Sequence, residues 1–203
     1  LVESGLIERY REGSWVYFYV ADGTRGGDLV CRVLGAADNA DTVLVRDQER
    51  ARVVKREREA AAQAFFEAHA ADWDNIRAVH VAEAEVEAAI LDMLGAGPFD
   101  LLLDLGTGTG RILELFGDRY AHGLGIDLNQ AMLAYARAKL SRKGLDKAQV
   151  RHGDLYNLSV EDNAASAVVM HQVLHFLSDP ARAIGEAARV LMPGGKLLIV
   201  DFA

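Results

Sequence analysis

The chain has 203 residues, of which 30 are acidic and 22 basic, a net charge of −8, and a 51% share of hydrophobic residues. This length and composition are typical of a globular protein with one full domain and a smaller part. The acidic balance argues against non-specific nucleic-acid binding by the whole chain, and no apolar run approaches the roughly 18 residues of a membrane helix. We therefore expect a cytoplasmic protein with no membrane partner, since nothing at the start resembles a signal peptide.

The two ends and the cysteine content add further expectations. The sequence starts at Leu1 without a methionine and stops at Ala203 just after an apolar run, so we expect a fragment cut at both ends. The single cysteine, Cys31, has no partner for an internal disulfide. A lone cysteine of this kind is most often a buried small hydrophobe.

The first zone, residues 1–23, is predicted to contain a β-hairpin. Ile7–Tyr10 and Trp15–Val20 are rich in β-branched and aromatic residues, and residues 11–14 between them include a turn-forming glycine. The second zone, residues 24–95, has no proline and is dense in Ala, Glu, Arg and Lys, which favours long helix. Its charges indicate a solvated helix face, with a dimer or interdomain helix as the alternative.

The third zone, residues 96–203, alternates short apolar runs with amphipathic stretches, which is typical of a parallel α/β sheet. The predicted strands are Leu101–Leu105, Gly123–Ile126, Gln149–Arg151, Ala165–Met170 and Lys196–Val200. The predicted helices are Arg111–Phe116, Gln130–Ser141 with Asn129 as N-cap, and Pro180–Leu191. We expect an open, Rossmann-like, doubly wound sheet whose ligand site lies at the carboxyl ends of the strands.

A glycine loop follows the first of these strands. Gly106, Gly108 and Gly110 alternate as G-x-G-x-G, and Arg111 stands where a dinucleotide fingerprint requires its last glycine. A phosphate-binding P-loop is also excluded, because no Gly-Lys-Ser/Thr follows. The loop allows backbone amides to approach a ligand closely, and Asp104 precedes it at the end of the strand.

Two further acids follow the next two strands. Asp127 lies 17 residues after Gly110 and is placed to accept hydrogen bonds from a ribose diol, with a helix-start carboxylate near Asn129 as the alternative. Asp154 and Leu155 are placed to contact an adenine amino group and ring, although Asp154 alone is also compatible with a turn. Three acids after successive strands suit a nucleoside that carries positive charge and no phosphates.

The stretch Leu101–Ala203 resembles a class I S-adenosylmethionine-dependent methyltransferase. DLGTGTG, GID, HGDL and RVLMPGGKLLIVDF match the motifs of that family in order. The resemblance implies S-adenosylmethionine as cofactor, with Gly106 and Gly108 along its methionine and ribose, Asp127 on the ribose hydroxyls and Asp154 with Leu155 at the adenine. The implied cofactor site comprises Asp104, Gly106, Thr107, Gly108, Asp127, Leu128, Asp154, Leu155 and His171.

Methyl transfer from a sulfonium requires an aligned acceptor and, for a protonated acceptor, a base. His171 and His175 in MHQVLHFL are the candidate catalytic residues, with a hydrogen-bonded structural role as the alternative for each. No metal site is expected from the ligand spacing. The resemblance points to a small-molecule acceptor, and arsenite is disfavoured because its methylation uses several cysteines.

The front of the chain resembles the end of an ArsR-type winged-helix domain. Leu1–Ile7 matches the end of its recognition helix and Arg9–Tyr19 its wing, in which Arg9 and Arg11 are either phosphate contacts or surface charges. The whole chain thus resembles an ArsR-family regulator fused to a methyltransferase, which implies DNA binding through a complete winged helix and a homodimer. In AFFEAHAADWDNIR, Trp73 and Arg77 would close over the cofactor, with Arg77 on its carboxylate.

Two other functions stay open. A transcription regulator whose methyltransferase fold only senses S-adenosylmethionine or a metabolite predicts binding without turnover. A nicotinamide-dependent oxidoreductase predicts NAD binding and is disfavoured by Arg111. The resemblance also implies two further strands after residue 203 that help to close the substrate side.

Overall fold

The computed structural model describes residues 1–12, 15–20, 24–36, 40–69 and 83–201. The chain divides into two compact units, Leu1–Val53 and Val54–Ala203, and each is described by itself. The division into residues 1–23, 24–95 and 96–203 stays a prediction.

The N-terminal unit contains the predicted hairpin. β1 (Ile7–Glu12) pairs antiparallel with β2 (Trp15–Val20), so the first strand is two residues longer than expected. Just before it, Gly5 has a φ of 64°. Its N–H donates to the Val2 carbonyl (3.0 Å) and the Leu6 N–H donates to the Leu1 carbonyl (3.1 Å). These two bonds around a left-handed glycine are those of a helix C-terminal turn of the Schellman type.

Three helices are described in the zone that was predicted to be helical. α1 (Arg25–Gly35) is capped by the Thr24 side chain, α2 (Thr42–His69) has mostly exposed described side chains, and α4 (Glu83–Leu94) packs on the sheet. Cys31 on α1 is exposed, so its expected burial is wrong. No helix in the described part of the chain combines the length and the apolar character needed to cross a membrane.

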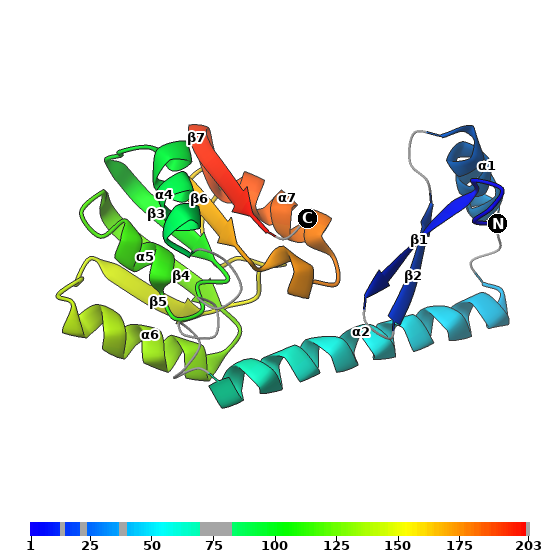
Figure 1. Ribbon diagram of the computed structural model, residues 1–203, viewed down its shortest axis with the longest axis horizontal. Coiled ribbons are helices and arrows are strands. Elements are labelled where there is room, and N and C mark those ends of the chain that lie inside the picture. The colour runs from blue at the N-terminus through cyan, green and yellow to red at the C-terminus, as the bar shows by residue number, and fades with distance from the viewer. Residues whose placement is uncertain (13–14, 21–23, 37–39, 70–82, 202–203) are drawn as a thin grey trace. The chain divides into compact units, whose positions relative to one another are not determined.

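A five-stranded sheet of parallel strands forms the centre of the second unit, in the order β5-β4-β3-β6-β7 (Figure 1). Its strands are β3 (Phe99–Leu105), β4 (Tyr120–Asp127), β5 (Ala148–His152), β6 (Ala165–His171) and β7 (Leu191–Val200). The order along the sheet reverses between β3 and β6. This arrangement confirms the predicted Rossmann-like, doubly wound fold.

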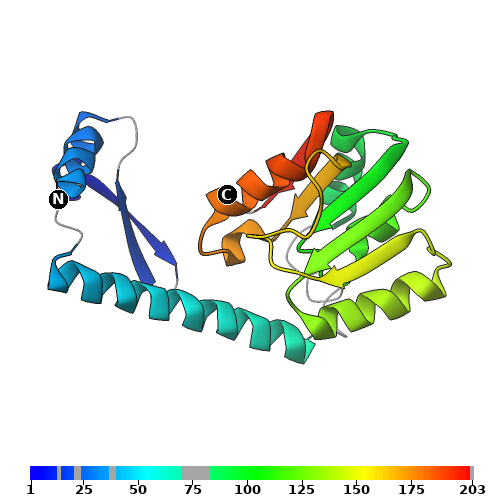
Figure 2. The same ribbon diagram turned by 180° about the vertical axis from the view of Figure 1, so that it is seen from behind.

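Alternating side chains of each strand pack on opposite faces of the sheet. Leu102 packs with α4, α5 (Arg111–Leu115) and α6 (Gln130–Arg142), whereas Leu103 packs with α7 (Pro180–Val190). Figures 1 and 2 show α4 and α5 on one face and α7 on the other. Because both faces are covered, the buried strands read as nearly continuous apolar runs. The carboxyl ends of β3, β4 and β6 therefore meet at one edge.

The structure corrects several predicted bounds. β7 begins at Leu191 rather than Lys196, since Leu191 pairs with Ala165 before a register shift around the Pro-Gly-Gly stretch. His171 is the last residue of β6 instead of the first residue after it. The Asn129 side chain accepts from the Met132 N–H at 3.0 Å, which confirms the predicted N-cap of α6.

Candidate active site

A cavity of about 260 Å³ opens at the carboxyl ends of β3, β4 and β6. Residues that the sequence assigned to the cofactor site line it together: Asp104, Gly106, Thr107, Gly108, Asp127, Leu128, Asp154, Leu155 and His171. Arg77 and Trp73 lie outside the described residues. The fold therefore brings residues from three successive βα connections to one place.

Hydrogen bonds to a backbone carbonyl of β4 and to the Asp104 carboxylate hold the glycine loop in place. The Gly106 and Thr107 N–H groups donate to the Ile126 carbonyl of β4 at 2.8 and 3.1 Å. The Thr107 hydroxyl donates to Asp104 Oδ2 at 2.6 Å, and Asp104 is only 1% exposed. The Asp104–Thr107 bond thus fixes the loop relative to the end of β3.

Gly106 and Gly108 have different neighbours. Both have positive φ, 78° and 51°. A Cβ on Gly106 would lie 2.4 Å from Val173 Cγ2, whereas a Cβ on Gly108 would meet nothing within 4 Å. Gly106 is therefore required by packing as well as by φ, and Gly108 borders open space in the cavity.

Asp127 ends β4 and binds the loop directly. Its Oδ2 accepts from the Gly108 N–H at 2.9 Å, and its Oδ1 accepts from the Asn129 N–H at 2.8 Å. Burial raises the pKa of this carboxyl, and the backbone hydrogen bonds only partly oppose that effect. Asp127 thus carries out the helix-start role that the sequence left open while also facing the cavity.

The residues after β5 form a tight turn. Asp154 Oδ1 accepts from the Tyr156 N–H at 2.9 Å, so the turn role left open for Asp154 is present. Leu155 is 4% exposed. The sequence reasoning missed Tyr156, whose ring lines the cavity and whose hydroxyl accepts from the Asp179 N–H at 3.0 Å. An aromatic residue directly after the HGDL motif was the available signal.

Arg111, at the start of α5, forms a bidentate ion pair with Glu87 of α4, at 2.6 and 2.7 Å. Its other terminal nitrogen lies 2.9 Å from Glu114. Hydrogen bonding to Glu87 raises the pKa of the guanidinium above its usual range. The sequence did not reveal Glu87, which lies 24 residues earlier on another helix. This pair links α4 to the helix that follows the glycine loop.

Two aromatic rings, Phe66 and Phe176, form an aromatic wall of the cavity. Their centroids are 4.8 Å apart with planes at 81°, an edge-to-face arrangement. Phe66 comes from the end of α2 and Phe176 from the short 3₁₀ helix η1 (Leu174–Phe176). The sequence reasoning did not include either ring in the site, because only the fold brings α2 to the end of β6.

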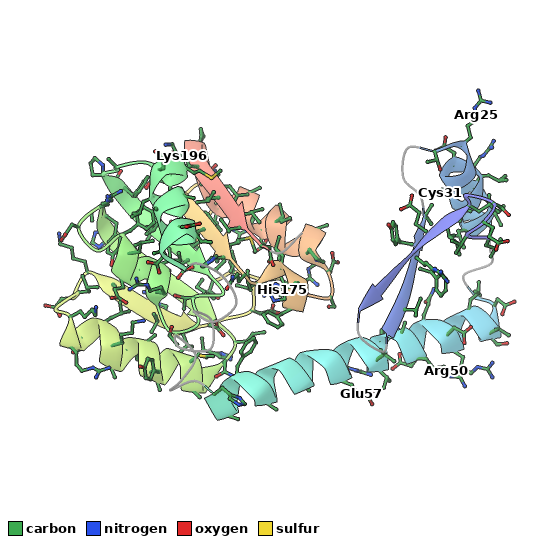
Figure 3. The ribbon with its side chains drawn as sticks, in the orientation of Figure 1. Arg25, Cys31, Arg50, Glu57, His175 and Lys196 are labelled. Atoms are coloured by element: carbon green, nitrogen blue, oxygen red, sulfur yellow. The ribbon has the colours of Figure 1, made fainter. Side chains whose placement is uncertain are left out.

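The two candidate histidines have different positions. His171 lines the cavity at the end of β6. His175 lies in η1, on the segment that follows β6 (Figure 3), and its Nδ1 is 2.5 Å from Asp201 Oδ1. Its ring centroid is 3.9 Å from that of Phe176. His175 therefore adjoins the aromatic wall and, unlike His171, is not among the residues that line the cavity.

The lining residues fit the cofactor that the sequence implies. Asp104 and Asp127 provide carboxylates for a cationic nucleoside, and the open space beside Gly108 lets the ligand approach the backbone. Among the described residues, no group of three or more His, Cys, Asp or Glu is arranged to hold a metal ion.

Comparison with known proteins finds one matching family model and several similar relatives. Residues 103–199 match the family described as "Methyltransferase domain". The chain is 36% identical over 103 residues to a demethylmenaquinone methyltransferase of Thermus thermophilus, covering 50% of the chain and 46% of the relative. It is 36% identical over 101 residues to a phosphatidylethanolamine N-methyltransferase of Cereibacter sphaeroides, covering 49% of each. The chain thus spans at most about half the length of these relatives.

A solved structure gives the same result. A crystallised S-adenosylmethionine-dependent methyltransferase from Aquifex aeolicus superposes with a TM-score of 0.53 and 27% identity. The match covers 57% of the chain and 63% of that protein.

Proposed function

We propose that this chain, in which residues 103–199 form a methyltransferase domain with S-adenosylmethionine as cofactor, transfers the methyl group to a small apolar acceptor. The observation that carries the proposal is that two unlike groups of residues line one cavity. We call the part lined by the glycine loop, Asp104 and Asp127 the cofactor end, and the part lined by the aromatic wall the acceptor end.

The carboxylates and the open glycine support a cofactor position beside the glycine loop. Asp127 would accept hydrogen bonds from the ribose hydroxyls, because both of its oxygens are already oriented by backbone N–H groups. Gly108 would lie against the methionine and ribose, and Leu155 would cover the adenine. Asp104 would stabilise the cationic end through the field of its buried carboxylate.

The apolar lining supports a place for the acceptor. Phe66, Phe176, Leu177 and Tyr156 all line the cavity, and such a lining suits a flat apolar molecule. The demethylmenaquinone methyltransferase relative supports this choice, because its name describes an acceptor of this kind.

The bound cofactor supplies an activated methyl group, so the protein chiefly has to position the acceptor and exclude water. The aromatic wall would hold the acceptor in line, and His171, at the end of β6, would border the reacting atoms. A histidine base is needed only where the acceptor loses a proton.

The test has two stages. Calorimetric titration with S-adenosylmethionine, S-adenosylhomocysteine and NAD is expected to show binding of the first two only, and Asp127→Ala is expected to abolish it. Transfer of radiolabelled methyl from S-adenosylmethionine is then measured with reduced demethylmenaquinone, 1-naphthol and vesicles of phosphatidylethanolamine. Binding without transfer to any of them would favour the alternative of a non-catalytic sensor.

A second function, DNA binding, is favoured by one observation in the N-terminal unit. The helix-type C-terminal turn at Gly5 runs directly into an antiparallel hairpin, as a recognition helix runs into a wing. We include in this proposal the ArsR-type regulator, the homodimer and the cytoplasmic location expected from the sequence. Fluorescence anisotropy with a labelled random 30-base-pair duplex, repeated with Arg9→Ala and at rising salt, tests it. Binding that does not weaken with salt or with the variant would contradict a phosphate-contacting wing.

A further inference from the structure

We propose that Asp201 is a positioning residue that orients His175 as the base for the acceptor's proton. This inference rests on the proposed function and adds to it that the acceptor atom carries a proton which it loses on methylation. Neither the motifs nor the comparisons assign a role to Asp201.

Two adjacent strands bring the pair together. His175 follows β6 and Asp201 directly follows β7, and these strands are parallel neighbours. Because both strands end at the edge that holds the cavity, their next residues meet there. His175 Nδ1 lies 2.5 Å from Asp201 Oδ1, the distance of a strong charge-assisted hydrogen bond.

Asp201 is itself held in place. Its second oxygen, Oδ2, accepts from the Leu174 N–H at 2.8 Å. Its side chain is 13% exposed, compared with 33% for His175, so the carboxylate is more shielded from solvent than the imidazole. The carboxylate therefore binds both the backbone of η1 and the ring of the histidine that η1 carries.

This geometry selects one tautomer of His175. A carboxylate beside Nδ1 keeps the proton on Nδ1, so the lone pair of the neutral ring is on Nε2. The same carboxylate stabilises the imidazolium that forms when Nε2 takes a proton. Asp201 thus prepares His175 to act as a base without contacting the acceptor.

The imidazole adjoins a residue that lines the cavity. Its ring centroid lies 3.9 Å from that of Phe176, which is part of the aromatic wall. When the acceptor atom bonds to the methyl carbon, its proton passes to His175 Nε2. The electron pair of the broken carbon–sulfur bond stays on sulfur, so S-adenosylhomocysteine leaves neutral and the positive charge moves to the imidazolium.

The first arm of the test determines the tautomer of His175 and requires no methyl transfer. Long-range ¹H–¹⁵N correlation spectra of the full chain, labelled with ¹⁵N-histidine and recorded where the rings are neutral, are assigned to His175 by the signals that His175→Gln removes. We expect a protonated Nδ1 and an unprotonated Nε2. In Asp201→Asn the ring is expected to shift toward the Nε2–H tautomer.

The second arm measures methyl transfer to reduced demethylmenaquinone and to 1-naphthol. Asp201→Asn is expected to lower kcat by about 10²-fold with the cofactor's KM unchanged, and Asp201→Glu to restore part of the rate. His175→Gln combined with Asp201→Asn should be no slower than His175→Gln alone, because Asp201 acts through His175. Asp162→Asn, an exposed carboxylate paired with Arg189, is the matched control and should keep the wild-type rate.

The possible failures are distinguishable. A wild-type chain that binds S-adenosylhomocysteine but methylates neither probe overturns the proposed transfer, and this inference with it. An active wild type whose Asp201→Asn variant keeps its kcat, or whose His175 carries its proton on Nε2, overturns this inference and leaves the methyl transfer standing. Equal losses in the two single variants with a far larger loss in the double variant would also contradict a role through His175.

Discussion

Replacing Asp127 by asparagine tests the cofactor end of the site most directly. The carboxylate accepts one backbone N–H on each oxygen, from Gly108 at 2.9 Å and Asn129 at 2.8 Å. Asparagine has a single acceptor oxygen, so its amide NH₂ must face one of these donors. The variant therefore loses an oriented backbone contact as well as the charge that would receive the ribose hydroxyls.

The expected size of the effect follows from hydrogen bonds to charged groups. Such a bond contributes about 1.5–3 kcal/mol, which corresponds to a Kd for S-adenosylhomocysteine that is about 10- to 150-fold higher. We expect this loss in calorimetric titration of Asp127→Asn, with a far-ultraviolet circular dichroism spectrum like that of the wild type.

Asp92→Asn is the matched control, since Asp92 is an exposed carboxylate on α4. It is expected to bind S-adenosylhomocysteine as the wild type does. A folded Asp127→Asn variant with a Kd within twofold of the wild-type value would refute the assignment of Asp127 to the ribose.

Four further predictions concern pH, the glycine loop, the core and the ion network. Burial raises the pKa of Asp127 and ribose donors favour its ionised form, so the cofactor affinity of the wild type should rise with pH through that pKa and then level off. The affinity of Asp127→Asn should not change with pH, and an equally flat profile in the wild type would contradict this prediction. Gly106→Ala should lower the free energy of unfolding in urea by about 1–3 kcal/mol, with partial rescue by Val173→Ala, whereas Gly108→Ala should chiefly weaken cofactor binding. Equal losses of stability in the Gly106→Ala and Gly108→Ala variants would show that the contact with Val173 does not matter. Leu103→Ala should lower the free energy of unfolding by about 2–5 kcal/mol in the same assay, because Leu103 of β3 is fully buried in the core that includes α7. A loss below about 1 kcal/mol would contradict that packing. Burial opposes ionisation of Glu114, but Lys143, Arg111 and Lys139 lower its pKa to about 2. The stability that ionised Glu114 contributes should therefore be lost as pH falls from about 4.5 to about 2, and Glu114→Gln should flatten this part of the pH profile of stability measured by urea unfolding.

The sequence by itself determined the parts of the site that lie within a few residues of a strand end. The glycine loop, Asp127 and the turn at Asp154 each follow an apolar strand, and the parallel order of the strands is enough to bring them to one edge. The N-cap at Asn129 was also readable, since its side chain bonds a backbone group only three residues away.

Tertiary structure decided the contacts between residues far apart in the chain. Glu87 meets Arg111, Phe66 meets Phe176, and Asp201 meets His175 only because helices and neighbouring strands place them together. Hydrophobic periodicity reports which face of an element is buried, but it carries no information about which distant side chain lies opposite. For this reason the sequence predicted the cofactor end from local motifs, whereas the aromatic wall and the partner of His175 emerged only from the packing of α2, η1 and β7.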